Sequence, residues 1–504
     1  MFMSYETIEQ ALADLARHQQ TMYAYNHAMA SITHDAGTAA PKNSTEGRSK
    51  AMEILSRVTY ELEADPKNGE LLSFLEAHAG ELDPIINRQV EVFRKGYDQM
   101  GRIPADEYVA YCVLLNEAQS AWEKAKNASD FEMFAPYLEQ VVAYNKKFAG
   151  YYDATKAPYD ALLYEYEEGM TMEILDVFFA QLRSAIVPLL TKIQAAQQVD
   201  DSFLHQKYPV ADQKKFAEYL MEVQGLDRGH CGIAESEHPY TLSFNPKDTR
   251  ITTHYYEDHM TFAMYSTIHE GGHAIYDMGG DECYHYTNLN GGVSMGIHES
   301  QSRFYENLIG RSRAYIHHIF PKVKELFPTQ LEGVDEEMFY RAVNKVEPSL
   351  IRTEADELTY ALHVMVRYEI EKKLMDGSLE IKNVPAVWNQ LYKEYLGIDV
   401  PDDKHGCLQD SHWSGGAIGY FPSYALGSAY GAQMLRKMQA DLGDVYADVE
   451  QGDLSKVTGW LHDKIHRYAC FKKPNALFED VCGKFDPKFF TDYLTEKFSA
   501  LYNL

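Results

Sequence analysis

Residues 264–277 read Met-Tyr-Ser-Thr-Ile-His-Glu-Gly-Gly-His-Ala-Ile-Tyr-Asp and contain a His-Glu-x-x-His motif from His269 to His273. Apolar residues at near-helical spacing, and the glycine pair at 279–280, predict a helix that ends at these glycines. Four residues advance a helix by about 400°, so the two imidazoles lie about 40° apart on one face. Both rings can therefore reach one metal ion, and Glu270 lies beside the first of them, where it can hold a water molecule.

The two central residues of the motif, Gly271 and Gly272, are unusual inside a helix. Each costs about 1 kcal/mol of helix stability relative to alanine. We expect this cost to be offset by a close approach to the helix backbone, such as that of a substrate strand. The alternative to a metal site is a chance pair of histidines on a helix surface. The five residues of the motif, His269–His273, do not exclude it on their own.

The composition describes a large acidic globular chain. Its 504 residues are 45% hydrophobic, enough for a sizeable core, and by length alone they could form about three domains. The net charge of −28 argues against a nucleic-acid partner and against binding to an anionic membrane surface. An acidic surface is mostly a solubility feature, although it also favours basic substrates.

The six cysteines are scattered, and no pair has the Cys-x-x-Cys spacing of a zinc ribbon or a redox site. Six cysteines in a chain of this length do not form a disulfide framework. The first residues lack the basic and apolar regions of a signal peptide, and no uninterrupted apolar run has transmembrane length. We therefore expect a reduced, cytoplasmic protein.

Most of the chain has helical periodicity with charged outward positions, as in packed amphipathic helices. In the first two hundred residues the predicted helices are Tyr5–Met29, one from about Glu46, Gly69–His78, Asp83–Met100, Ala105–Lys126, Phe131–Phe148 and Met172–Ala196. The segment 227–255 departs from this pattern. Its two runs of β-forming residues, 240–244 and 250–255, predict a small β-hairpin or ribbon. This ribbon lies just before the predicted helix of the His269–His273 motif, which we call the metal helix. Such a strand could pair with an extended peptide, although an ordinary structural hairpin fits the pattern equally well.

Beyond the metal helix, the pattern predicts a helix that begins after Ser294 and another over 348–374. The stretch 406–431 is rich in glycine and aromatic residues, and we predict that it is irregular. Long irregular segments in a helical protein often carry function. The last seventy residues or so return to helices.

A catalytic zinc needs a third protein ligand and one open position. The carboxylates that follow the motif are Asp277, Asp281, Glu282, Glu299 and Glu306. Asp277 lies too far along the same helix, so we prefer Glu299, which a neighbouring helix can present. Glu306, seven residues on, is on the same face and suits a carboxylate that orients a ligand histidine. His298 is a weaker candidate ligand, because its side chain points about 100° away from that of Glu299.

Six sequence blocks now resemble, in order, those of the carboxypeptidase Taq family of thermostable-type metallocarboxypeptidases. They are His238-Pro239-Tyr240, Asp248-Thr-Arg250-Ile-Thr252, His269–His273, His298-Glu299-Ser300-Gln301, Ile351-Arg352-Thr-Glu-Ala355-Asp356-Glu357 and Gly406-Cys-Leu-Gln409-Asp410-Ser-His412-Trp413. Many members have Phe at the position of Tyr240. Members also commonly have Trp where this chain has His34, before Asp35.

The resemblance implies a mainly α, saddle-shaped protein with a deep central groove. The small β-ribbon beside the metal site is predicted from the β-forming runs described above. It also implies a homodimer and a single peptidase unit over 1–504. Within that unit we distinguish a helical N-terminal part (1–225), a catalytic part with the metal site (226–440) and C-terminal helices (441–504).

The implied activity is the removal of single amino acids from peptide C-termini with broad specificity, using zinc or sometimes cobalt. Carried over by position, His269, His273 and Glu299 are the metal ligands. Glu270 is the general acid/base.

Two further tasks need residues of their own. The tetrahedral oxyanion needs a donor besides the metal, and His412, Tyr420 and Tyr424 are candidates, although simple packing is the alternative for at least one tyrosine. A substrate with a free C-terminus needs a cation for its carboxylate, and a planar guanidinium suits this task best. Arg352 is our first choice and Arg250 our second.

Alternatives remain for several of these residues. Arg352 could instead form a surface ion pair with Asp356, four residues on in a helix. His238 and Gln409 are expected to contact substrate.

Other functions are a zinc oligopeptidase that cuts inside peptides, an aminopeptidase, and an inactive peptide-binding protein. The aminopeptidase is disfavoured, because we find no Gly-x-Met-Glu-Asn-like segment. The intact Glu270 disfavours the inactive protein, because a binding module does not need a proton shuttle.

Overall fold

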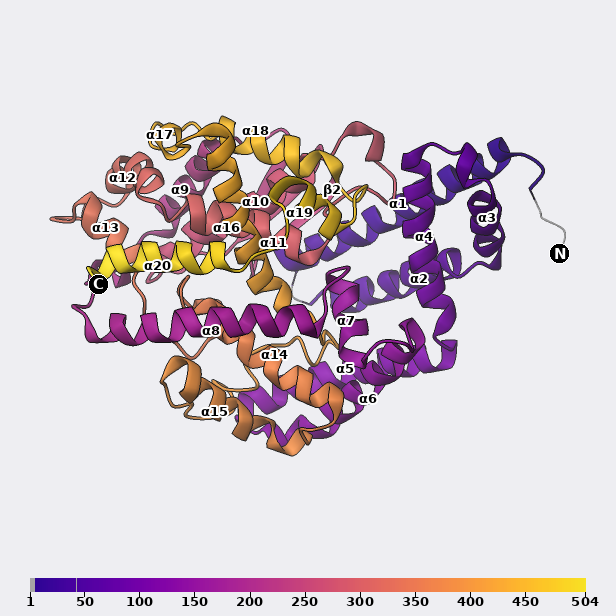
Figure 1. Cartoon of the computed structure of the whole chain (residues 1–504), viewed down its shortest axis with the longest axis horizontal. Helices are drawn as coiled ribbons and strands as arrows, with labels where there is room; N and C mark the ends of the chain where they lie inside the picture. Colours follow the sequence, from indigo (N-terminus) through magenta and orange to yellow (C-terminus); the bar gives the residue numbers. More distant parts are fainter. Residues whose placement is uncertain (1–4, 42) are drawn as a thin grey trace.

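The structure is a computed structural model that describes residues 5–41 and 43–504. Within these residues the chain is mainly helical, as predicted, with one small sheet (Figure 1). The α-helices of the first half are α1 (Ile8–Thr38), α2 (Thr45–Glu63), α3 (Pro66–Ala77), α4 (Pro84–Arg102), α5 (Ala105–Ala128), α6 (Ala135–Tyr152), α7 (Pro158–Tyr166), α8 (Met172–Ala195), α9 (Val210–Val223) and α10 (Met260–Met278).

The α-helices of the second half are α11 (Met295–Arg303), α12 (Arg313–Leu326), α13 (Glu336–Val343), α14 (Tyr360–Asp376), α15 (Val384–Leu396), α16 (Pro422–Leu442), α17 (Tyr446–Val449), α18 (Ser455–Lys464), α19 (Pro474–Cys482) and α20 (Lys488–Tyr502). The short 3-10 helices are η1 (Ala79–Glu81), η2 (Phe131–Met133), η3 (Ser202–His205), η4 (Glu282–Tyr284), η6 (Arg352–Glu354), η7 (Ile381–Asn383) and η8 (His466–Tyr468), and η5 (Phe304–Ile309) is a π-helical continuation of α11.

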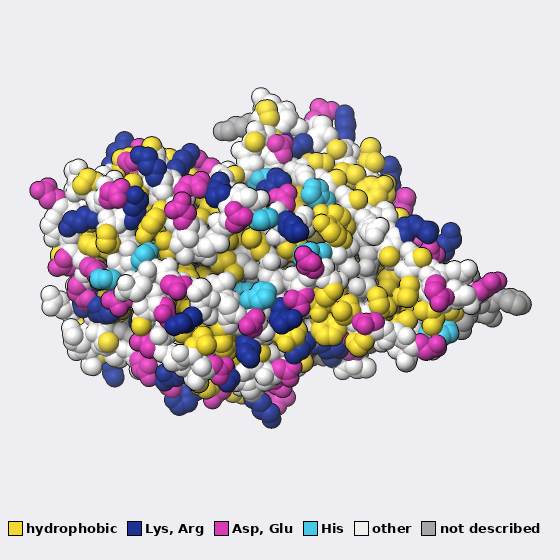
Figure 2. All heavy atoms as spheres, turned by 90° about the horizontal axis from the view of Figure 1, so that it is seen from above, with side chains coloured by type: hydrophobic (Ala, Val, Ile, Leu, Met, Phe, Trp, Pro, Cys, Tyr) yellow, Lys and Arg dark blue, Asp and Glu magenta, His cyan; other side chains and the backbone are white. Residues whose placement is uncertain are grey.

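The N-terminal helices α1 to α4 form one end of the molecule, and α8 and α20 run side by side across the other part (Figure 1). A small core within α1, α3 and α4 includes Leu15, Leu72 and Leu75. The main core runs from Leu114 to Tyr502 and so joins all three of the parts predicted from the sequence. The charged surface that Figure 2 shows carries acidic and basic side chains side by side.

The predicted hairpin is part of a three-stranded sheet of order β1-β3-β2. β2 (Thr241–Asn245) and β3 (Asp248–Thr253) form the antiparallel hairpin. The sequence prediction missed β1 (Cys231–Glu235), which pairs parallel to β3 with Ile233 opposite Ile251. Both β2 and β3 pack against α10, so the sheet lies beside the metal helix as predicted.

The helix predicted over 348–374 is wrong in its first part, because α14 begins only at Tyr360. Before it, the Asp356 carboxylate accepts hydrogen bonds from the N–H groups of Leu358 and Thr359, at 3.0 Å each. Asp356 therefore holds the turn that precedes α14, and the carboxylate that pairs with Arg352 is that of Asp410. The irregular stretch predicted over 406–431 is correct up to residue 421, where Pro422 starts α16 in the position that suits proline.

By length and composition alone, α8 could cross a membrane. Core helices of soluble proteins meet the same criterion, and the buried face of α8, including Leu175, Phe178 and Leu182, belongs to the main core. In this structure α8 packs against α14, α15 and α20.

Candidate metal centre

The site is built where α10 and α11 pack together closely. A Cβ atom on Gly272 would lie 2.7 Å from the Gln301 carbonyl oxygen and 2.8 Å from Ser302 Cα, both backbone atoms of α11. On the other side of α11, a Cβ atom on Gly427 of α16 would lie 2.6 Å from Glu299 Cγ. The close approach expected at the motif glycines is therefore that of the helix carrying Glu299, at least for Gly272, and no substrate strand is needed to explain it.

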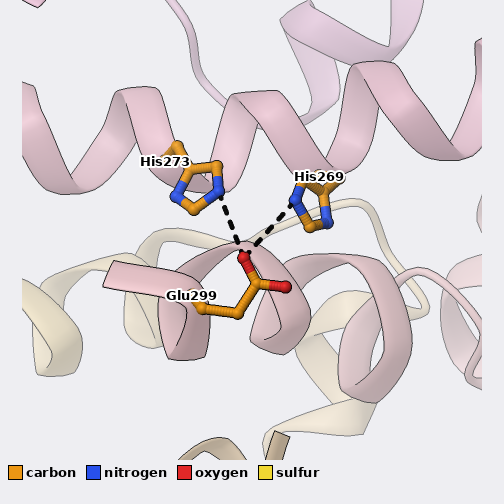
Figure 3. Close-up of side chains that lie close together, drawn as sticks. All are labelled: His269, His273 and Glu299. Carbon is orange, nitrogen blue, oxygen red and sulfur yellow. Dashed lines mark ion pairs between the residues drawn. The ribbon is translucent and has the colours of Figure 1, made fainter. Parts of the chain in front are cut away.

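This packing brings together the three predicted ligands, His269 and His273 from α10 and Glu299 from α11 (Figure 3). Glu299 Oε2 lies 3.8 Å from His269 Nε2 and 3.6 Å from His273 Nε2. Tetrahedral ligands at about 2.0–2.2 Å from an ion lie roughly 3.3–3.6 Å from one another. Two imidazoles and a carboxylate at this spacing fit a divalent ion such as zinc, with one coordination position left open.

The other nitrogen of each histidine is already engaged. His269 Nδ1 donates to Glu306 Oε2 at 2.8 Å, so Glu306 makes the contact predicted for it and orients a candidate ligand histidine. His273 Nδ1 lies 2.6 Å from His298 Nδ1, and His298 Nε2 lies 2.9 Å from Asp277 Oδ1. Such partners fix the rotation of the rings and leave both Nε2 atoms free for an ion.

Arg303 keeps the carboxylates of Glu299 and Glu306 in their charged form. Its Nε donates to Glu299 Oε1 at 2.8 Å, and its Nη1 donates to Glu306 Oε2 at 3.0 Å. Burial alone would raise the pKa of Glu306, but Arg303 and His269 outweigh it and lower that pKa to about 2. Burial likewise opposes ionisation of Glu299, yet Arg303 and His269 hold its pKa well below the usual range. Both carboxylates are therefore charged at neutral pH.

Glu270 lies on α10 next to the first ligand and is only 7% exposed. The Thr241 hydroxyl from β2 lies 2.6 Å from Glu270 Oε2 and 2.9 Å from the Glu270 carbonyl oxygen. Thr241 thus holds one oxygen of this carboxylate in place. The sheet beside the metal helix supplies this contact.

The buried carboxylate of Glu167 binds the first turn of α11. Glu167 Oε2 accepts the Gly296 N–H in the first turn of α11 at 2.9 Å, where the helix dipole favours a negative charge. A Cβ atom on Gly296 would lie 2.6 Å from that oxygen. Burial nevertheless raises the pKa of Glu167 to about 7.

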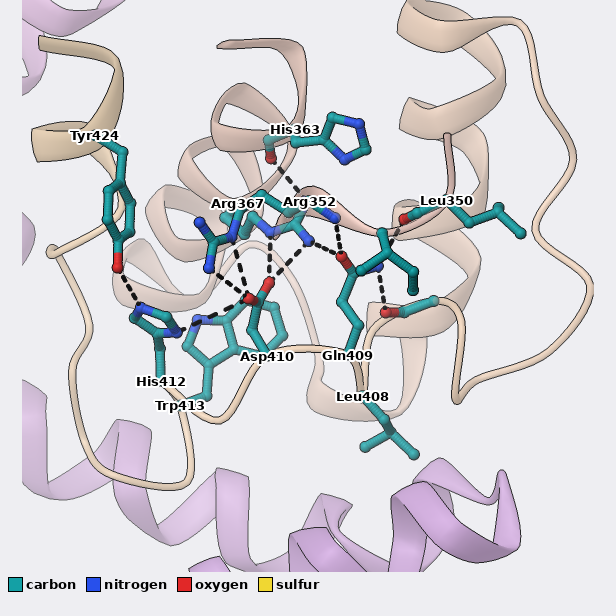
Figure 4. Close-up of polar contacts among 12 residues, drawn as sticks. Leu350, Arg352, His363, Arg367, Leu408, Gln409, Asp410, His412, Trp413 and Tyr424 are labelled. Atoms are coloured by element: carbon teal, nitrogen blue, oxygen red, sulfur yellow. Dashed lines mark hydrogen bonds and ion pairs between the residues drawn. The ribbon is translucent and has the colours of Figure 1, made fainter. Parts of the chain in front are cut away.

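Arg352 and Arg367 share one buried carboxylate, that of Asp410 (Figure 4). Arg352 Nη2 donates to Asp410 Oδ1 at 2.9 Å, and Arg352 Nη1 donates to the Tyr360 hydroxyl at 2.9 Å. With the contact from Nε, these bonds use three of the five N–H bonds of a guanidinium. Burial raises the pKa of Asp410, but the two arginines outweigh it and hold that pKa far below its usual range.

The three candidate oxyanion donors form an aromatic cluster at the start of α16. His412 Nε2 lies 3.1 Å from the Tyr424 hydroxyl, while Tyr420 and Tyr424 pack edge to face at 5.1 Å. Burial lowers the pKa of His412 to about 4, so this imidazole is neutral at pH 7. Burial, followed by the charge of Glu299, raises the pKa of Tyr420 to about 12. All three side chains thus keep their proton at neutral pH, and the hydrogen bond between His412 and Tyr424 uses one of these protons.

The remaining predicted substrate-binding residues lie in different surroundings. Arg250 makes a paired contact with Asp248, with two nitrogen–oxygen distances of 2.9 Å, and stacks over Phe244. His238 is exposed in the connection between β1 and β2. The Gln409 side chain is engaged within the protein, because its oxygen accepts from the N–H of Arg352 and from Arg367, so it anchors a loop.

Two departures from the family pattern contact each other. The Tyr240 hydroxyl lies 3.0 Å from His34 Nδ1, and the two rings pack edge to face at 5.9 Å. This hydrogen-bonded pair ties α1 to the residue just before β2.

Sequence reasoning missed Thr241, Arg303, Arg367 and Glu371 as parts of the site. Arg303 could have been found by its spacing of four from Glu299 and three from Glu306. Arg367 and Glu371 lie four residues apart on one face of α14, within the mostly apolar run from Tyr360 to Leu374, which is a signal of a buried polar network.

The helical fold, the His-Glu-x-x-His pair and the carboxylate from the next helix together define a helical metallopeptidase. A sequence model of the carboxypeptidase Taq (M32) metallopeptidases matches residues 14–498, nearly the whole chain. The chain belongs to this family.

Known relatives support the same assignment. Carboxypeptidase 1 of Bacillus subtilis is 40% identical over 504 residues, which cover 100% of both chains. Thermostable carboxypeptidase 1 of Thermus thermophilus is 38% identical over 481 residues, 93% of this chain and 94% of the relative. The crystal structure of the M32 carboxypeptidase from Deinococcus radiodurans superposes with a TM-score of 0.95 at 35% identity and covers 98% of this chain and 100% of that one. The chain is thus a metal-dependent carboxypeptidase by family.

Proposed function

We propose that the protein is a zinc carboxypeptidase of broad specificity that uses Glu270 as its general acid and base. The observation that carries this proposal is the cluster of His269, His273 and Glu299, with Glu270 buried next to it. A divalent ion bound there would polarise the scissile carbonyl and acidify the attacking water. Zinc suits a donor set of two imidazoles and one carboxylate, and cobalt is the alternative ion.

The proton transfers fall to Glu270. Its carboxylate takes a proton from the attacking water and passes it to the nitrogen of the leaving amino acid, while Thr241 holds one of its oxygens. Charge develops on the former carbonyl oxygen as the water attacks. His412 and Tyr420 are the protein donors that we assign to this charge, with Tyr424 holding the imidazole.

The substrate carboxylate is assigned to Arg352. Its guanidinium is fixed by Asp410 and Tyr360 and retains two further N–H bonds for a bidentate contact. Tyr360 also lies under Arg303, 4.1 Å from the guanidinium carbon to the ring centre, and Arg303 binds Glu299. This chain of contacts links the proposed carboxylate site to the metal ligands, whereas Arg250 has its paired contact with Asp248.

The activity can be tested with one peptide in two forms, free and amidated at its C-terminus, followed by mass spectrometry. A carboxypeptidase shortens the free peptide one residue at a time from its C-terminus and cleaves the amidated one far more slowly. Internal fragments would instead indicate an oligopeptidase. An unchanged peptide with fully metal-loaded protein would indicate a peptide-binding protein.

Arg352→Lys is expected to weaken cleavage of the free peptide by about 10-fold to 100-fold in kcat/KM, because an ammonium cannot replace a bidentate guanidinium. Cleavage of the amidated peptide should change little, so preference for the free form should fall. Arg250→Lys serves as the matched control and should retain that preference. If Arg250→Lys loses it and Arg352→Lys does not, Arg250 is the carboxylate-binding residue.

We also propose a homodimer in the cytoplasm that acts on peptides and not on nucleic acid or membranes. The dimer is supported by the family resemblance alone. All six cysteines are free thiols, as expected in a reducing compartment. The net charge of −28 repels nucleic acids and anionic lipids.

A further inference from the structure

The connection between α15 and α16, residues 397–421, has no regular helix or strand, and we call it the α15–α16 loop. It carries His412 and Tyr420, the side chains assigned to the oxyanion. Loops of this length without secondary structure need other contacts to hold their shape. Gly416 and Gly419 have φ angles of +75° and +97°, so the loop turns through conformations that only glycine adopts easily. Its backbone alone therefore does not fix these two side chains.

Arg367, which is fully buried on α14, makes the first set of side-chain contacts that hold the α15–α16 loop. Its Nη2 donates to Asp410 Oδ2 at 2.8 Å and to Gln409 Oε1 at 2.7 Å (Figure 4). Because Asp410 also binds Arg352, the same carboxylate sets the position of the loop and of the guanidinium assigned to the substrate carboxylate.

Glu371, one helical turn further along α14 and also fully buried, makes the second set of contacts with the loop. Its carboxylate accepts three hydrogen bonds, from Trp413 Nε1 at 2.8 Å, from the Gly419 N–H at 2.9 Å and from the Tyr159 hydroxyl at 2.7 Å. Burial raises the pKa of Glu371 to about 7, and the three donors oppose this rise by favouring the charged form. Two of the three donors belong to the loop, and Tyr159 belongs to α7.

We propose that Arg367 and Glu371 are positioning residues that hold the α15–α16 loop in its active shape. The anchored residues bracket the reacting ones, because His412 lies between Asp410 and Trp413, and Tyr420 directly follows Gly419. A shift of either anchor therefore moves a proposed oxyanion donor. The reaction itself, and the roles of His412 and Tyr420, rest on the proposed function; the fastening of the loop does not.

Glu371→Gln tests this role with little change of shape. The amide offers one acceptor oxygen and presents an NH2 group to side chains that are themselves donors, so at least one of the three bonds is lost. We expect kcat to fall by about 10-fold or more, because small displacements of catalytic groups are costly, while KM and the bound metal stay close to those of the wild type. Tyr159→Phe is the matched control, since it removes the one bond to this carboxylate that comes from α7 and leaves both bonds from the loop, those of Trp413 and Gly419. It should lower the thermal stability but retain kcat.

Hydrogen exchange of the metal-loaded protein provides a second measurement. Backbone amides within 411–421 should exchange faster in Glu371→Gln than in the wild type or in Tyr159→Phe. Equal exchange in all three proteins, or Tyr159→Phe as slow in turnover as Glu371→Gln, would overturn the positioning role. If the wild type released no C-terminal residues, the proposed function would fail, and the exchange comparison would still decide the positioning role.

Discussion

Glu270→Gln is expected to keep the divalent ion and to lower kcat by about 10²-fold to 10⁴-fold, the usual contribution of a general acid and base. The amide has the shape of the carboxylate, and its oxygen can still accept the hydrogen bond from Thr241. It cannot take a proton from the attacking water, so the chemical step is slowed while the three proposed metal ligands remain intact. Steady-state rates on a short free peptide, with the metal content of the same samples, measure both effects.

Thr241→Val provides a graded comparison for this prediction. It removes the hydroxyl that holds Glu270 but leaves the carboxylate, so its loss of kcat should be clearly smaller. Full activity in a metal-loaded Glu270→Gln variant would rule out Glu270 as the proton carrier.

Gly272→Ala is expected to break the metal site without touching a ligand. The added Cβ would lie 2.7 Å from the Gln301 carbonyl oxygen, a backbone atom that cannot rotate away. α11 would have to move, and overpacking of this kind costs about 1–3 kcal/mol of stability. Because Glu299 is carried by α11, we expect a loss of metal affinity of about 10-fold to 100-fold, as for other changes around metal ligands. Competition with a chelator, followed by zinc quantification, measures this affinity.

Gly459→Ala is the matched control for this variant. Gly459 also lies inside a helix, α18, but an added Cβ there meets nothing within 4 Å among the described residues. This substitution should raise the stability by about 0.5–1 kcal/mol and leave metal affinity unchanged. Wild-type metal affinity in Gly272→Ala would show that the close approach of α11 is not needed for the site.

The sequence was sufficient to predict the mainly helical fold and the shared face of His269 and His273, because helical spacing fixes which side chains share a face. Glu299 was preferred because a neighbouring helix could present it, and the family resemblance implied the same residue. The position of Glu306 beside His269 followed from the same periodicity. The reason for the glycines did not, because spacing along one helix says nothing about which other helix packs against it. Only the structure shows that Gly272 meets α11.

The errors fall where tertiary contacts override local pattern. Residues 348–359 have helical periodicity, yet Arg352 binds the buried Asp410 and Asp356 holds a turn that precedes α14. β1 was missed because its partner β3 lies beyond the intervening β2, so no local turn signal joins the two strands. Glu371 makes its contacts with residues far away in the sequence, which no single-sequence pattern connects.

Anomalous X-ray diffraction at the absorption edge of the bound ion, from crystals of the active protein, tests the central claim most directly. We predict one peak per chain within about 2.0–2.2 Å of His269 Nε2, His273 Nε2 and Glu299 Oε2. A peak at another place in the molecule, or no peak in crystals of protein that retains full activity, would contradict the account.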